Sequence, residues 1–161
     1  AQSFNVAVDA FYIRKKEVDI TMVYSPANHD HLVSYIVSYG IADKLGVNSI
    51  LNFESRNYIR YGSNLLGFTH GDKANNSDLP SLMSVERPLD WGITKYRYFF
   101  RGHKHHKERK DFRGCTVIGM RSLSSPDKWH RDSGYVGVHR ATEGFLVDKE
   151  RGIIAEYSIS L

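Results

Sequence analysis

The spacing of apolar residues changes along the chain and divides it into two halves. In the first half, residues 1–16 and 31–45 carry apolar side chains at helical spacing, and the second of these segments ends at Gly46, a residue typical of helix ends. Between them lies a short run rich in β-branched residues, 18–24. The order of helix, strand, polar break and helix predicts an α/β layer.

The second half is dominated by short strand patterns separated by turn residues. One short helix is expected, at residues 79–85, ending before Pro88. The remaining segments predict four strands, at 49–53, 57–61, 65–69 and 98–101, and two hairpins, one pairing 108–112 with 116–121 and the other pairing 142–148 with 153–159.

Composition narrows the class of protein. A chain of 161 residues with 41% hydrophobic residues suits one folded domain, 1–161. Its single cysteine, Cys115, fits a reducing compartment, and no apolar stretch approaches the length of a membrane span. We therefore expect a soluble, cytoplasmic protein without a membrane partner. The net charge of +4 permits a polyanionic partner without requiring one.

Polar residues stand where the predicted strands end. Asn28 and His29 follow the first strand, His70 follows the 65–69 strand, and the Gly102–His106 stretch follows the apolar run before it. In α/β sheets, ligand sites collect at the carboxyl ends of strands. If the backbone stays extended, His103 and His105 lie about 6–7 Å apart and suit two neighbouring metal ions.

The same histidines also have simpler interpretations. Gly102 would let the backbone turn sharply towards bound ions, but the basic residues around it equally fit a solvated loop. Taken alone, His70 fits an ordinary turn, and the cluster around His29 fits the polar start of a helix.

Taken together and in this order, the three loops resemble the later motifs of the calcineurin-like metallophosphoesterases, G-N-H-D/E, a lone H, and G-H-x-H. They stand here as residues 27–30 (ANHD), 69–72 (THGD) and 102–105 (GHKH). The stretch 68–73 (FTHGDK) is most similar to phage and bacterial members. If the protein is phage-encoded, we expect it in the host cytoplasm. The resemblance implies a four-layer α/β/β/α fold, a β-sandwich flanked by helices, with its N-terminal strands missing.

The resemblance also implies a role for each matching residue. Asn28, His70 and His103 would hold one divalent ion and His105 a second, the ions being Mn, Fe or Zn. Among the catalytic residues, His29 would protonate the leaving oxygen or stabilise charge on the phosphoryl group, and Asp30 would orient a neighbouring imidazole. Asp72 would orient a neighbouring imidazole. The implied activity is hydrolysis of phosphomonoesters or phosphodiesters, with DNA among the candidate substrates.

Two departures from the family pattern matter. Ala27 replaces the glycine before the asparagine, and the first two family motifs, D-x-H and G-D-x-x-D, do not occur ahead of Asn28. One of the two metal sites is therefore expected to be incomplete. We expect the chain either to pair with a complementary N-terminal chain or segment that carries these motifs, or to be inactive by itself.

An alternative function keeps the fold without the catalysis. In this interpretation the chain is a nucleic-acid-binding or assembly module, and its phosphate contacts come from the basic residues of the histidine-rich stretch and the hairpin after it. These residues are Lys104, Lys107, Arg109, Lys110 and Arg113.

Overall fold

A computed structural model describes residues 19–26, 31–122 and 140–160 of the chain. The chain divides into two compact units, residues 1–57 and 58–161, and each is described by itself. The predicted helix within residues 1–16 lies outside the described residues, as do Asn28, His29 and Asp30. Among the described residues, no helix is both long and apolar enough to cross a membrane.

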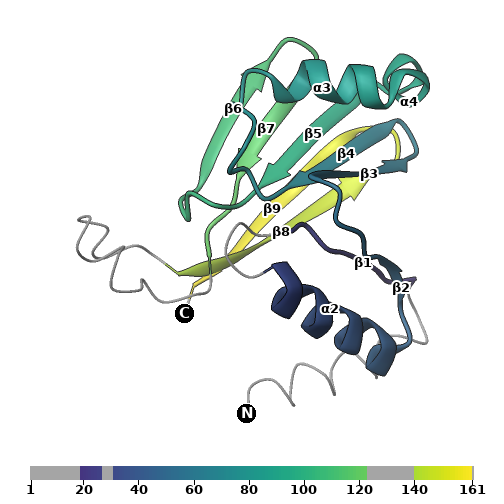
Figure 1. The fold of residues 1–161 in the computed structure, drawn as a ribbon. Coiled ribbons are helices and arrows are strands. Elements are labelled where there is room, and N and C mark those ends of the chain that lie inside the picture. The colour runs from purple at the N-terminus through teal and green to yellow at the C-terminus, as the bar shows by residue number, and fades with distance from the viewer. Residues whose placement is uncertain (1–18, 27–30, 123–139, 161) are drawn as a thin grey trace. The chain divides into compact units, whose positions relative to one another are not determined.

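The first unit contains two parallel strands joined through a helix. Strand β1 (Thr21–Val23) pairs with β2 (Asn48–Ile50), and helix α2 (His31–Leu45) lies between them in sequence (Figure 1). The helix stops because Gly46 takes a positive φ of 56°, which a glycine adopts without steric cost. This helix and the strand before it confirm the predictions for 31–45 and 18–24, although β2 is shorter than the predicted 49–53 strand.

Tyr24 anchors the first unit at the carboxyl end of β1. Its buried hydroxyl donates a hydrogen bond to the carbonyl oxygen of His31 at 2.9 Å, in the first turn of α2. The Asn57 amide nitrogen in turn donates to the carbonyl oxygen of Tyr24, also at 2.9 Å. Tyr35 packs edge-on against the Tyr24 ring and stacks on Phe53. These contacts fix the two ends of the segment that carries the predicted N-H-D motif.

The second unit is built on a five-stranded mixed sheet in the order β3-β4-β5-β7-β6. Strands β4, β5 and β7 run parallel, and β6 runs antiparallel to β7 at the outside of the sheet. Thr69 at the end of β4 lies opposite Arg101 at the end of β5, which lies opposite Gly119 at the end of β7. The three carboxyl ends therefore meet at one edge. The strand bounds are Arg56–Tyr61 for β3, Asn64–Thr69 for β4, Tyr96–Arg101 for β5, Glu108–Phe112 for β6 and Cys115–Gly119 for β7.

Each face of this sheet is covered by a different layer. On one face, Phe99 is fully buried against helix α3 (Leu79–Glu86), which is followed by the short helix α4 (Pro88–Ile93). On the other, Tyr98 and Phe100 pack against the hairpin of β8 (Ala141–Asp148) and β9 (Gly152–Ser160) (Figure 1). The alternation along β5 explains this division, since successive side chains of a strand point to opposite faces.

The helix, sheet and hairpin layers agree with the order predicted for a β-sandwich flanked by helices, and both predicted hairpins are confirmed. One element was not predicted, because Pro88 was interpreted only as the end of a helix. It instead opens α4, where proline is well tolerated because the first N–H of a helix has no intrahelical partner.

Candidate metal centre

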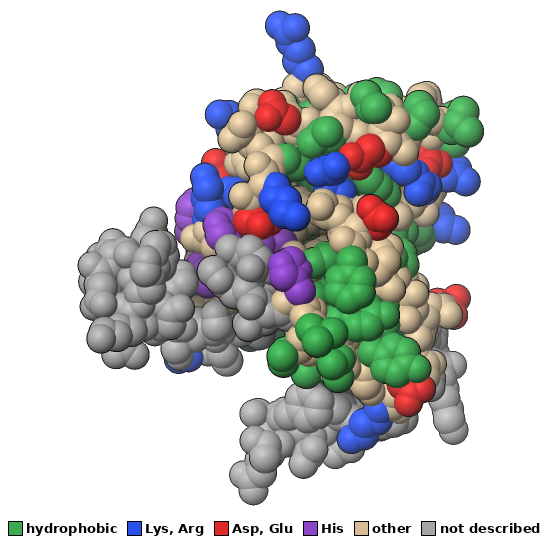
Figure 2. Space-filling view, viewed as in Figure 1, with side chains coloured by type: hydrophobic (Ala, Val, Ile, Leu, Met, Phe, Trp, Pro, Cys, Tyr) green, Lys and Arg blue, Asp and Glu red, His purple; other side chains and the backbone are tan. Residues whose placement is uncertain are grey.

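Two histidines lie side by side at the edge where the parallel strands end. His70 follows β4 directly, and His103 follows β5 after one residue. Their Nε2 and Nδ1 atoms are 3.2 Å apart, and their rings meet edge-on at a centroid distance of 5.0 Å. This contact follows from the strand register, because Thr69 and Arg101 are paired neighbours and the two loops start together. Histidine side chains gather on one side of the visible surface, beside basic ones (Figure 2).

The backbone also joins the two loops. The N–H of Gly102 donates a hydrogen bond to the carbonyl oxygen of His70 at 3.1 Å. Gly71, with a φ of 95°, lies against the side chain of Arg101, where an added Cβ would stand 3.3 Å from the arginine Cβ. His70 is therefore held from both sides by residues of the other loop. Both imidazoles remain partly exposed, which leaves them open to a ligand from solvent.

The prediction that His103 and His105 lie on an extended backbone is wrong. Their φ angles are 66° and 54°, in the left-handed region, so their side chains do not follow strand alternation. Strand pairing ends at Arg101, and the N–H of Lys104 then donates to the carbonyl oxygen of Gly102 at 2.8 Å in a tight turn. Histidine is among the residues enriched in this region of backbone space.

The sharp backbone turn that was predicted at Gly102 is not made by this residue. It is absent from the positive-φ glycines of the described residues, and a Cβ added to it would lie 3.5 Å from the carbonyl oxygen of His70, an ordinary contact. The sharp turn is made by the two histidines after it.

The spacing of the His70 and His103 nitrogens fits one metal ion. Two nitrogen ligands at about 2.0–2.1 Å from a tetrahedral zinc ion are about 3.3 Å apart, close to the 3.2 Å observed here. Within residues 19–26, 31–122 and 140–160, no three His, Cys, Asp or Glu side chains are grouped closely enough to hold an ion. The pair thus supplies two ligands, and His105 does not join it in one group. Asp72, the predicted orienting carboxylate, is exposed.

The basic residues near the histidines are largely compensated by carboxylates of the hairpin. Lys107 lies 3.7 Å from a Glu143 oxygen and 3.4 Å from a Glu156 oxygen, and Arg109 pairs with Glu156. The Glu143 side chain is 1% exposed and also pairs with Arg121 at 2.9 Å. Of the five residues predicted to contact phosphate, Lys107 and Arg109 are therefore already engaged, while Lys104 is exposed.

One ion pair beside the histidines was not found from the sequence. Arg101, 2% exposed, donates from Nη2 to the Oε2 atom of Glu108 at 3.0 Å. The hydrogen bond from Arg101 lowers the pKa of Glu108, and the positive charges of Lys104 and His106 act in the same direction. In the sequence, Arg101 and Glu108 stand at the two ends of the histidine stretch. Charged residues in such a stretch are normally interpreted as surface residues, so the pairing could not be inferred.

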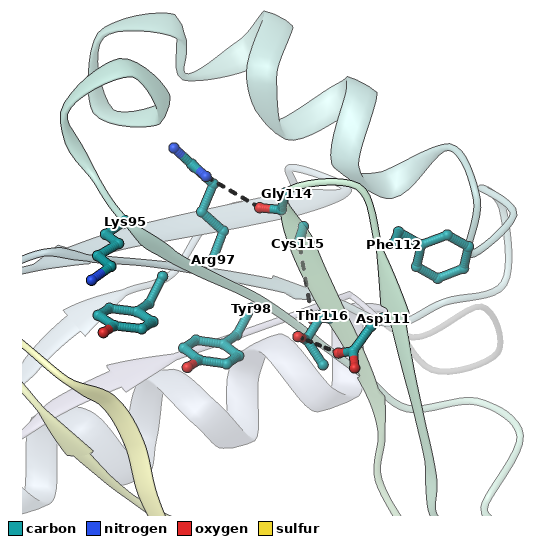
Figure 3. A pocket seen from close by; sticks show the side chains of 9 residues that line it. Lys95, Arg97, Tyr98, Asp111, Phe112, Gly114, Cys115 and Thr116 are labelled. Atoms are coloured by element: carbon teal, nitrogen blue, oxygen red, sulfur yellow. Dashed lines mark hydrogen bonds between the residues drawn. The ribbon is translucent and has the colours of Figure 1, made fainter.

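A shallow pocket lies at the other end of β5. Arg97 lines it and donates to the carbonyl oxygen of Gly114 at 3.3 Å (Figure 3). The Arg97 guanidinium also stacks over Trp91. Cys115 also lines it, but burial raises the pKa of its thiol to about 12, so the thiol stays protonated and is a poor nucleophile. Cys115 is therefore not a candidate nucleophile, and the histidine edge, where two imidazoles meet, is the stronger candidate site.

Comparison with known proteins bears on the fold. No family model matches the chain, and no curated protein matches it in sequence. A solved structure of wild-type Vps29 complexed with zinc, from Entamoeba histolytica, is 13% identical with a TM-score of 0.51, covering 97% of this chain and 87% of that chain. An archaeal phosphodiesterase is 13% identical with a TM-score of 0.50, covering 96% of this chain and 74% of that chain.

Likeness at such low identity speaks for the fold alone. It nevertheless agrees with the layers described above, in which the parallel strands of a central sheet end at the histidine edge. The predicted fold class is confirmed: the chain has a mixed α/β fold with a central sheet flanked by helices, similar to the folds of the Vps29 and archaeal phosphodiesterase structures.

Proposed function

We propose that this chain carries part of the metal centre of a phosphoesterase that hydrolyses phosphomonoesters or phosphodiesters, with DNA among its candidate substrates. The observation that carries the proposal is the His70–His103 pair, whose nitrogens stand 3.2 Å apart at the carboxyl edge of parallel strands. The fold, similar to that of an archaeal phosphodiesterase and of a zinc-complexed Vps29, supports the same class of activity.

In this proposal His70 and His103 bind one divalent ion together with the amide oxygen of Asn28. In the proposal His105 binds a second ion, because its side chain is not grouped with His70 and His103 among the described residues and so is not counted as a ligand of the first ion. Nitrogen and oxygen ligands without thiolate suit Mn, Fe or Zn. Such ions, when bound, neutralise phosphoester charge and make the attacking water more acidic.

The remaining chemistry falls to the N-H-D motif. His29 protonates the leaving oxygen, a task suited to an imidazole, and Asp30 orients a neighbouring ring. Asp72 is the corresponding candidate beside His70, and its exposure leaves it accessible to solvent. Lys104 is the exposed cation best able to meet a substrate phosphate, since Lys107 and Arg109 are paired with Glu143 and Glu156.

The full centre needs more ligands than the described residues provide. A carboxylate that bridges two ions is missing from the ligand set that we assign to this chain, and no D-x-H motif occurs before Asn28. We therefore include in the proposal a complementary chain or segment that carries D-x-H and G-D-x-x-D. Without it, the chain is expected to bind metal weakly and to hydrolyse slowly or not at all.

The proposal is tested by Mn²⁺ titration calorimetry and by hydrolysis of a chromogenic phosphodiester, each with and without a fragment that carries the two missing motifs. We expect Mn²⁺-dependent turnover, strongest with the fragment, and its loss in His70→Ala and His103→Ala. The matched control is His106→Asn, because His106 is an exposed histidine of the same loop and asparagine can keep its hydrogen bond to the carbonyl oxygen of Lys104. Equal Mn²⁺ affinity in all three variants and the unmodified chain would refute the metal assignment.

A further inference from the structure

Three residues lie abreast across the end of the sheet. Gly119, the last residue of β7, is the register partner of Arg101 on β5 and of Glu108 on β6. Register partners point their side chains to the same face of a sheet. Because the middle residue has no side chain, the Arg101 guanidinium reaches over β7 and pairs with Glu108 at 3.0 Å.

Gly119 is needed for this arrangement. A Cβ added to it would stand 3.3 Å from the Cβ of Glu108 and 3.3 Å from the carbonyl oxygen of His106. Both distances are tighter than ordinary van der Waals contact, so a side chain there would push the start of β6 and the end of the histidine loop away. Arg101 and Glu108 are also the two residues that bound this loop, so their ion pair closes its base.

The ion pair contacts both histidine-bearing loops. Glu108 Oε2 accepts a second hydrogen bond from the Asn76 amide at 3.4 Å, in the segment that follows His70, and lies 4.0 Å from the His106 ring. Gly71 packs on the Arg101 side chain. The carbonyl oxygen of Arg101 accepts the N–H of Met120 at 2.8 Å, which ties the pair to the loop after β7 as well.

The histidine loop needs such a restraint. His103 and His105 both hold left-handed backbone conformations, and a non-glycine residue in this region persists only where its surroundings fix it. Within the loop, the N–H of Lys104 donates to the carbonyl oxygen of Gly102, and the His106 ring contacts the carbonyl oxygen of Lys104. The ion pair at the loop base adds a restraint whose arginine is buried, at 2% exposed, and whose glutamate is partly exposed, at 34%.

We propose that Arg101 and Glu108 are positioning residues that hold the His70 and His103 imidazoles at the spacing required to share one metal ion. This inference rests on the proposed function for its metal. The pair contacts neither substrate nor ion; it acts through the backbone of the two loops. Residues that hydrogen-bond directly to a metal ligand typically change metal affinity by about 10- to 100-fold when they are replaced, and we expect the indirect restraint described here to act at the lower end of that range.

The test compares Glu108→Gln with Asp111→Asn in the full chain. Both changes replace a carboxylate of β6 by its amide, and Asp111 also bonds a neighbour on β7, accepting from the Thr116 hydroxyl at 2.7 Å, but at the end of the strand away from the histidines. We expect Glu108→Gln to weaken Mn²⁺ binding about 10-fold and Asp111→Asn to leave it unchanged. Arg101→Gln should weaken binding further, and Arg101→Lys should recover part of the loss.

A second measurement separates this inference from the proposed function. In metal-free, isotope-labelled protein, the Cα shifts of His103 and His105 report the left-handed backbone directly. We expect them to move in Glu108→Gln and to stay in Asp111→Asn. If they move while even the unmodified chain binds no Mn²⁺, the positioning role stands and the proposed function fails. If Glu108→Gln leaves both the shifts and the Mn²⁺ affinity unchanged, the positioning role is wrong.

Discussion

Gly102 gives its N–H to the carbonyl oxygen of His70 at 3.1 Å, and this hydrogen bond rather than the flexibility of glycine is what the position contributes to the site. A Cβ added to Gly102 would lie 3.5 Å from the same oxygen, which is an ordinary distance. Gly102 therefore occupies a position at which a small side chain such as that of alanine would also fit.

Replacing Gly102 therefore separates two explanations. Gly102→Ala keeps the N–H and should bind Mn²⁺ within about threefold of the unmodified chain, a difference of about 0.7 kcal/mol or less. Gly102→Pro removes the donor and should lose most of the affinity. Calorimetric titration of both variants is the measurement. A large loss in Gly102→Ala would mean that the backbone freedom of glycine is needed after all.

The Arg101–Glu108 pair predicts how stability depends on pH. The hydrogen bond from Arg101 lowers the pKa of Glu108 in the folded protein, so the pair stabilises the fold above about pH 4.3, the ordinary value for a glutamate. That contribution is lost as the pH falls through the lowered folded value. Urea unfolding between pH 7 and pH 3 should show a shallower acid-side loss in Glu108→Gln. Identical slopes in the two proteins would argue against a stabilising pair.

The hydrogen bonds of Asn64 predict that replacing this residue, which does not contact the histidines, destabilises the fold. Its side chain is fully buried, and its amide nitrogen donates to the carbonyl oxygens of Tyr61, Asp148 and Lys149 at 2.9, 2.9 and 3.0 Å. These bonds join the β3–β4 turn to the β8–β9 turn. Asn64→Ala removes these hydrogen bonds at a fully buried position and should lower the free energy of unfolding by about 2–3 kcal/mol, although the carbonyl oxygen of Lys149 keeps the N–H of Ser63 as a donor. Asn75→Ala, at an exposed loop position, is the control and should cost less than about 0.5 kcal/mol.

Because Lys107 is already paired with carboxylates near the site, we expect its replacement to change the stability of the fold and not the binding of nucleic acid. Lys107 compensates Glu143, whose side chain is 1% exposed, so Lys107→Ala should lower the free energy of unfolding by about 1 kcal/mol. It should not change the salt dependence of any DNA binding. If the chain were instead a nucleic-acid-binding module that uses Lys107, this variant would reduce the slope of log affinity against log salt by about 1.

Much of the fold could be predicted from the sequence because its signals are local. Helix α2 ends where Gly46 permits a positive φ, and the hairpins appear where apolar runs flank turn residues. The meeting of His70 and His103 also followed from a general rule, since both residues stand just after parallel strands. Helix α4 was missed because Pro88 can end one helix and open another, and local sequence does not distinguish the two roles.

The geometry of the histidine loop could not be predicted for a different reason. The turn at His103 and His105 is left-handed, and nothing local requires non-glycine residues to adopt that conformation. What we propose as its cause, the pairing of Arg101 with Glu108 over Gly119, depends on a strand that comes later in the chain. Long-range register of this kind cannot be read from the spacing of residues in one loop. The role of Asn28 with this pair stays a prediction, because it lies outside the described residues.

Strand β6, the outermost strand of the described sheet next to β7, carries Arg109, Lys110 and Asp111 in succession. An uncharged, flat strand in that position would present a row of free backbone groups as a template for a second molecule. The charged side chains on this strand make such pairing less favourable, because a second strand docked beside it would have to remove part of their hydration. Strand β6 therefore protects the edge of the sheet from pairing with other copies of the chain. Its first residue, Glu108, also closes the base of the histidine loop.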